Sequence, residues 1–169
     1  MNTLRLTPGP IDRAILEDSL RTAMAAVGSF LAARLLGMPE AYWATLSAII
    51  VAQSTLGAAA AISWQRLAGT VLGAGTGAVL ATFFHNNLWI FGLGVFILGL
   101  LCAWLRLGPA YRFSGVTLAV IMLIPRNHAA WIIAFHRLIE VATGIAVGLV
   151  LSGLWPKIPG NLAEDEPAR

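Results

Sequence analysis

Arg66, Arg137 and Glu140 stand within long apolar segments, where a charged side chain needs a physical reason. An arginine deep in an apolar helix costs about 2.5–3.5 kcal/mol unless it reaches the interface, pairs with an acid or lines a water-filled path. A guanidinium binds a carboxylate through two parallel hydrogen bonds, so two such arginines suit an organic anion. The alternative is structural, with both arginines reaching lipid phosphates or capping neighbouring helices.

Glu140 follows Arg137 by three residues on one helical face. The favoured interpretation is an ion pair within the helix, and the alternative is a carboxyl group that takes up and releases a proton. His136, beside Arg137, can titrate near neutral pH. The three histidines lack the spacing of metal ligands, and no cofactor motif is present, so we expect neither a metal nor a cofactor.

Polar residues also interrupt two apolar segments. Gln53, Ser54 and Thr55 follow one short segment, and Arg126, with His128 nearby, follows another. Free backbone groups at such breaks are tolerated in a membrane only against protein or water. These residues are therefore predicted either to line a substrate path or to form covered loops.

The composition places these residues in a membrane protein. Of 169 residues, 58% are hydrophobic and 11% charged, whereas soluble domains carry about 25% charged residues. The 11 Lys and Arg are scattered between apolar runs, without the basic stripe of nucleic-acid binding, so no nucleic-acid partner is expected. No catalytic triad, carboxylate pair or cysteine pair stands out, and we expect no enzyme.

Six apolar segments predict an all-α, polytopic protein, because about 20 helical residues cross a bilayer. They lie at about 20–37, 42–53, 58–84, 88–107, 111–124 and 129–155. An amphipathic cytoplasmic segment (1–19) would precede the membrane domain (20–156), and a disordered cytoplasmic tail (157–169) would follow it. The excess of Lys and Arg on the side of the termini predicts that both ends are cytoplasmic, and the six tryptophans are expected at the two interfaces.

A displacement of 71 residues aligns WQRLAGTVLGAGTGAVL (64–80) with FHRLIEVATGIAVGLVL (135–151). Arg66 then falls on Arg137. The alignment predicts two repeats, about 20–84 and 88–155. Since each has three spans, they would be inverted relative to each other, the usual build of secondary transporters.

Glycines recur four residues apart within the aligned helices. This spacing lets membrane helices approach closely. We expect the third and sixth spans to pack through these glycines, with subunit contact as the alternative; they are Gly69, Gly73, Gly77, Gly144 and Gly148.

The stretches YWATLSAIIVAQSTLG and QRLAGTVLGAGTGAVL resemble the fusaric acid resistance and aromatic acid exporter superfamily. The marker is an arginine followed by Gly-Thr and by glycines four apart, here Arg66, Gly69, Thr70, Gly73 and Gly77. The resemblance covers about residues 11–155. It implies export of weak organic acids, often aromatic carboxylates. We therefore expect a transporter subunit in the inner membrane of a bacterium, and proton coupling through Glu140 is an option.

Two other functions stay open: an organic-anion channel of the same architecture, as in the related malate channels of plants, and a non-transporting partner of a larger complex. Many family members carry a large cytoplasmic domain or a second six-span unit, and this sequence has neither. We therefore expect a homo-oligomer in the lipid bilayer, with a dimer favoured over a trimer or larger assembly.

Overall fold

The computed structural model describes residues 13–84, 87–124 and 128–155, and these ranges are helical apart from short turns. The helices are α1 (Arg13–Leu35), α2 (Tyr42–Ala52), α3 (Leu56–Phe83), α4 (Leu88–Trp104), the 3-10 turn η1 (Gly108–Ala110), α5 (Tyr111–Leu123) and α6 (Ala130–Leu154). The predicted all-α class is confirmed, and each predicted apolar segment coincides closely with one α-helix. The amphipathic residues from Arg13 onward are continuous with α1.

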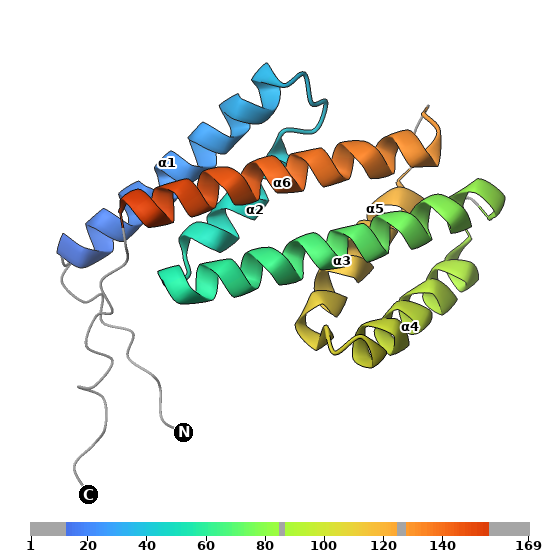
Figure 1. The fold of residues 1–169 in the computed structure, drawn as a ribbon. Coiled ribbons are helices and arrows are strands. Elements are labelled where there is room, and N and C mark those ends of the chain that lie inside the picture. Colours follow the sequence, from blue (N-terminus) through green and yellow to red (C-terminus); the bar gives the residue numbers. More distant parts are fainter. Residues whose placement is uncertain (1–12, 85–86, 125–127, 156–169) are drawn as a thin grey trace, which may run out of the picture.

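Two helices dominate the architecture. The segments Gly57–Phe83 of α3 and Ala130–Leu154 of α6 are long and apolar enough to cross a membrane. They lie side by side and antiparallel, with α1 and α2 packed on α6 and with α4 and α5 packed on α3 (Figure 1). α2 has 11 residues and α5 has 13, so each rises less than the roughly 30 Å of a hydrocarbon core.

The first and fourth helices end in the same backbone motif. Gly37, with φ +72°, follows α1, and the Met38 N–H donates to the Ala33 carbonyl at 3.0 Å. Arg106, with φ 56°, follows α4, and the Leu107 N–H donates to the Cys102 carbonyl at 2.8 Å. This is the Schellman motif, whose left-handed residue is usually glycine.

The glycines lie at helix crossings, but their expected partner is wrong. Gly69, Gly73 and Gly77 of α3 meet α5, and Gly144 and Gly148 of α6 meet α2. The backbones approach most closely there, because each long helix receives a short helix on its glycine face.

The Gly144 crossing illustrates how little space remains between α6 and α2. A Cβ on Gly144 would overlap the Ala44 carbonyl oxygen and lie 2.6 Å from the Ser47 Cβ. The small side chains of α2 at this point are fully buried.

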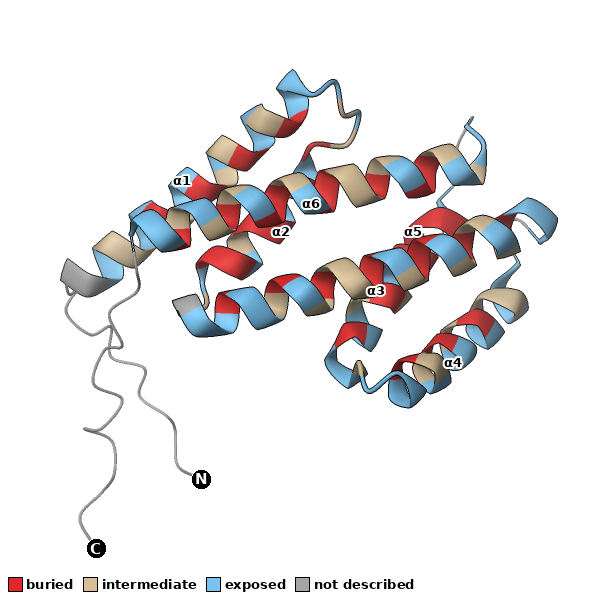
Figure 2. Cartoon of the chain, viewed as in Figure 1, coloured by how far each residue is buried: buried red, intermediate tan, exposed pale blue. Residues whose placement is uncertain are grey.

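Buried residues concentrate on the facing sides of the helices, whereas the outward faces are exposed (Figure 2). The outward face of α4 is large and apolar, with Leu93, Phe96, Ile97 and Leu100 all exposed. An extensive apolar exterior suits a lipid environment, because apolar side chains on the outward faces can contact lipid and only the inward faces must pack against protein.

Candidate functional site

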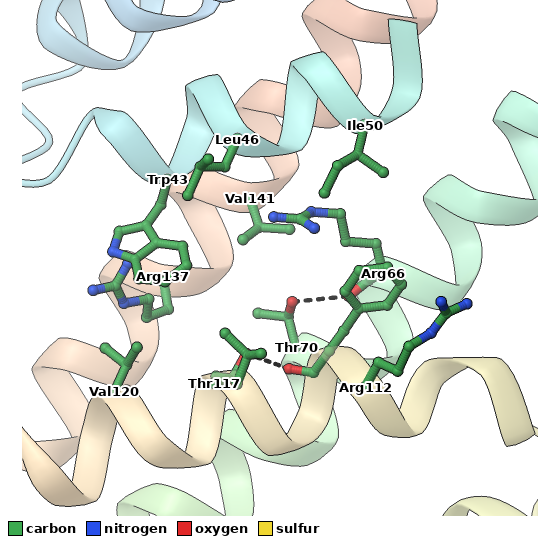
Figure 3. A pocket seen from close by; sticks show the side chains of 12 residues that line it. Trp43, Leu46, Ile50, Arg66, Thr70, Arg112, Thr117, Val120, Arg137 and Val141 are labelled. Atoms are coloured by element: carbon green, nitrogen blue, oxygen red, sulfur yellow. Dashed lines mark hydrogen bonds between the residues drawn. The ribbon is translucent and has the colours of Figure 1, made fainter. Parts of the chain in front are cut away.

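A cavity of about 250 Å³ lies where α2 and α5 meet α3 and α6. Its walls are mostly aliphatic and aromatic, with three arginines and two threonines among them (Figure 3). The lining residues are Trp43, Leu46, Ile50, Arg66, Thr70, Arg112, Phe113, Val116, Thr117, Val120, Arg137 and Val141.

Each buried arginine of this cavity contacts an aromatic ring. The Arg66 guanidinium carbon lies 5.0 Å from the centre of the Phe113 ring, and that of Arg137 lies 4.1 Å from the centre of the Trp43 ring. A guanidinium over an aromatic face is stabilised by the electrons of the ring. The contacts also fix the direction of both arginine side chains.

Arg66 is only 6% exposed, yet no carboxylate pairs with it among the described residues. Its Nε donates to Ser47 Oγ at 2.9 Å, and its main-chain carbonyl accepts from Thr70 Oγ1 at 2.8 Å. A guanidinium carries five N–H donors. A buried cation without an acidic partner is costly, so this end of the cavity favours an anion.

Arg137 is 3% exposed and has acidic partners. It pairs with Glu40 and, through Nη1, with Glu140 Oε2 at 3.4 Å, the spacing within the helix that the sequence predicts. Glu40 Oε2 also accepts from the Tyr42 hydroxyl at 2.7 Å and from Trp43 Nε1 at 3.1 Å. The Glu40 N–H donates to Glu140 Oε1 at 3.0 Å.

The two ends of the cavity therefore match in geometry but differ in charge. A displacement of 71 residues relates Arg66 to Arg137, and one of 70 relates Trp43 to Phe113. The displacement of 71 relates Glu140 to Gly69, and the displacement of 70 relates Glu40 to Ala110. The residues that correspond to the two acids at the Arg66 end are therefore uncharged. The acids are thus confined to the Arg137 end.

Several residues predicted from the sequence lie away from this cavity. Gln53 and Thr55 are exposed at the far end of α2, about 15 Å along the helix from Trp43, and Ser54 Oγ donates to the Val51 carbonyl at 2.6 Å. His136 is half-buried outside the lining set.

Arg126 lies outside the described residues, whereas His128 is described and exposed. A path through any of these residues stays a prediction.

Sequence reasoning missed the rings and Glu40. Trp43 was expected at the membrane interface; instead it lines the cavity and contacts Arg137. The available signal was the match of WATLSAIIVA (43–52) with FSGVTLAVIM (113–122) at a displacement of 70. The long helices align at a displacement of 71 residues. At that displacement the two short helices are out of register by one residue, so their match is not seen.

Comparison with known proteins identifies the family. The model of the family described as "Fusaric acid resistance protein-like" matches residues 25–151. The chain belongs to this family.

Curated relatives of this fusaric acid resistance-like chain are bacterial. "Uncharacterized transporter YdhK" of Escherichia coli K12 is 30% identical over 148 residues, covering 82% of this chain and 22% of YdhK. YdhK of Salmonella typhimurium is 30% identical over 155 residues, covering 86% and 23%. "Inner membrane protein YeeA" of E. coli K12 is 28% identical over 142 residues, covering 81% and 40%.

No solved structure matches this fusaric acid resistance-like chain. The chain spans about a fifth of the length of YdhK and two fifths of YeeA. The resemblance seen in the sequence is confirmed, and the relatives that the chain matches are named as bacterial transporters and as an inner membrane protein.

Proposed function

We propose that this helical domain is a transporter subunit that exports small aromatic carboxylates across the bacterial inner membrane, with the cavity as its substrate site. The observation that carries the proposal is Arg66, a nearly buried cation that lines the cavity and has no carboxylate partner among the described residues. A substrate carboxylate would supply the missing negative charge through charge-assisted hydrogen bonds.

The size and the walls of the cavity suit an aromatic ring. An apolar protein cavity of about 150 Å³ holds benzene, so about 250 Å³ leaves room for a ring with a carboxylate. Leu46, Ile50, Val116, Val120 and Val141 provide apolar walls. Apolar walls with a few polar groups at fixed positions are typical of small-molecule sites.

The inverted repeat is the second part of the proposal. It is supported by the antiparallel α3 and α6 and by their corresponding crossings, Gly73 against Ser114 and Gly144 against Ala44. With both termini cytoplasmic, Arg66 would lie toward the cytoplasmic end of the cavity and Arg137 toward the outer end. The two repeats could then exchange their packing about a pseudo-two-fold axis in the membrane plane, and each exchange would open the cavity to the other side of the membrane.

Proton coupling through Glu140 and assembly into a homo-oligomer, with a dimer as the expected form, belong to the same proposal. A buried carboxyl group near an arginine is a common element of proton pathways in membrane proteins.

Counterflow in proteoliposomes tests the function. Vesicles loaded with unlabelled benzoate are mixed with labelled benzoate, and acetate and malate are compared as aliphatic acids. We expect transient accumulation of labelled benzoate, strongly reduced by Arg66→Gln and unchanged by Arg34→Gln, since Arg34 is exposed on α1 and is not among the residues that line the cavity.

The alternatives give different results in the same preparations. A channel would carry benzoate current across a planar bilayer without a proton gradient. A chain that supports neither counterflow nor current, and in which Arg66→Gln has no effect in cells, would contradict the proposal and favour a non-transporting partner.

A further inference from the structure

Arg137 lines the same cavity as Arg66, but protein carboxylates already accept hydrogen bonds from both of its Nη groups. Glu40 and Glu140 both pair with it, Glu40 from the turn before α2 and Glu140 from α6. The side chains of Arg137 and Glu140 are 3% and 1% exposed, and that of Glu40 is 17% exposed. Such a cluster has the chemistry of an anion site that is filled by the protein itself.

The cluster has a defined set of neighbours. The Tyr42 hydroxyl donates to Glu40, and the Trp43 ring covers Arg137. Other charged or titratable groups on the surrounding elements are Arg66 on α3, Arg112 on α5, exposed Arg34 on α1 and half-buried His136 on α6. Among the described residues, the carboxylates bonded to Arg137 are therefore the groups that compete directly with an incoming anion.

A proton changes this competition. Protonation removes the charge of a carboxylate and converts one of its oxygens from an acceptor into a donor. The group then no longer forms an ion pair with a guanidinium. A substrate carboxylate can then accept hydrogen bonds from the Arg137 N–H groups that the protonated acid has released. One proton and one anion bind together in this way, and the net charge of the cluster stays the same.

We propose that Arg137 is a second anion site of the cavity, closed by Glu40 and Glu140 and opened when one of them takes up a proton. This inference deepens the proposed function and rests on it for the class of anion. It makes the two ends of the cavity unequal: the Arg66 end binds benzoate at any pH at which benzoate is ionised, and the Arg137 end binds it with proton uptake.

Titration calorimetry with benzoate separates the two sites. The purified full chain is titrated in two buffers of different ionisation enthalpy, which gives the number of protons taken up per anion. The pH range begins about two units above 4.3, the ordinary pKa of a glutamate carboxyl group. A carboxylic acid such as benzoate stays ionised throughout this range. Arg66→Gln removes the first site and leaves the Arg137 cluster intact.

We expect Arg66→Gln to bind benzoate with uptake of up to one proton, and its Kd to rise up to about tenfold per pH unit. Adding Glu40→Gln and Glu140→Gln should abolish the proton uptake and the pH dependence. It should also tighten binding near neutral pH by roughly 5- to 150-fold, the usual range of coupling between sites. Glu17→Gln, an acid of α1 that is not part of the cavity, is the matched control.

Three results overturn the inference: no benzoate binding by Arg66→Gln at the acidic end of the range, binding without proton uptake, or proton uptake that survives the loss of both acids. If the two Gln substitutions prevent folding, Glu40→Gln alone, at the most exposed member of the cluster, must reduce the proton uptake. Proton-linked binding that is identical in the wild type and in Arg66→Gln would support the inference while contradicting the proposed role of Arg66.

Discussion

The guanidinium carbon of Arg137 lies 4.1 Å from the centre of the Trp43 ring, although 94 positions separate the two residues in the chain. The corresponding pair, Arg66 and Phe113, repeats the contact at 5.0 Å. Each pair joins a long central helix to a short helix. The cavity between the two pairs therefore has an arginine and a ring at each end.

The ring that faces Arg66 should contribute to the affinity of the cavity for benzoate. Phe113→Leu removes the face that positions Arg66, an interaction worth about 0.5–2 kcal/mol, and should weaken benzoate binding roughly 2- to 30-fold. Inhibition of labelled-benzoate counterflow by unlabelled benzoate measures the affinity for benzoate, and inhibition by butyrate gives the affinity for an aliphatic acid. Phe96→Leu, on the exposed face of α4, is the control; an equal effect of the two substitutions would contradict the role of the ring.

The crossing of α6 over α2 should not tolerate a side chain. Gly144→Ala places a methyl group against the Ala44 carbonyl, and such overpacking costs about 1–3 kcal/mol. Gly75→Ala has no atom within 4 Å of the new Cβ and should be neutral or slightly stabilising. Thermal unfolding in detergent compares them. Equal melting temperatures would mean that the close approach is not required.

The left-handed residues after α1 and α4 predict opposite effects. Arg106→Gly relieves a side chain from φ 56° and should raise the free energy of unfolding by about 1 kcal/mol. Gly37→Ala puts a Cβ at φ +72° and should lower it by a similar amount, since no neighbour crowds that position. Thermal melts of the two variants decide this, and shifts of the same sign would rule out the explanation.

Arg21 joins three helices at the opposite end from the Arg137 cluster. It is 2% exposed and donates to the carbonyls of Ala52 and Trp155, the latter at 3.0 Å, and to Asp18. Arg21→Met leaves buried acceptors unpaired, at a cost of about 1–3 kcal/mol. We expect a lower melting temperature and unchanged benzoate affinity; Arg34→Met, at an exposed position, should change neither. A loss of affinity without a loss of stability would assign Arg21 to the site instead.

The helices could be predicted from the sequence because their boundaries carry local signals. Pro39, the polar residues 85–87 and Gly108-Pro109 interrupt apolar runs, and the helices end within a few residues of them. Arg66 and Arg137 could also be recognised as candidate site residues, because burying an arginine inside an apolar helix costs free energy wherever that helix lies. Both inferences depend on the residue and its immediate neighbours.

The partners of these residues could not be predicted in the same way. Glu40 reaches Arg137 across 97 positions, and nothing near Glu40 in the sequence indicates this contact. The glycine spacing indicated a close helix contact but not which helix provides it, since any helix with small residues would fit. The cavity is likewise a product of tertiary packing, which places residues of α2 and α5 around the same space between α3 and α6.

Equilibrium binding of benzoate to the purified protein tests the central claim most directly, because it measures the site without requiring transport. Titration of the wild type, Arg66→Lys and Arg66→Gln should give saturable binding that is weakened by the lysine and reduced roughly 10- to 150-fold by the glutamine. This range corresponds to a charge-assisted hydrogen bond worth about 1.5–3 kcal/mol. Equal affinity in all three proteins, or no binding by the wild type, would contradict the claim that Arg66 holds an aromatic carboxylate in this cavity.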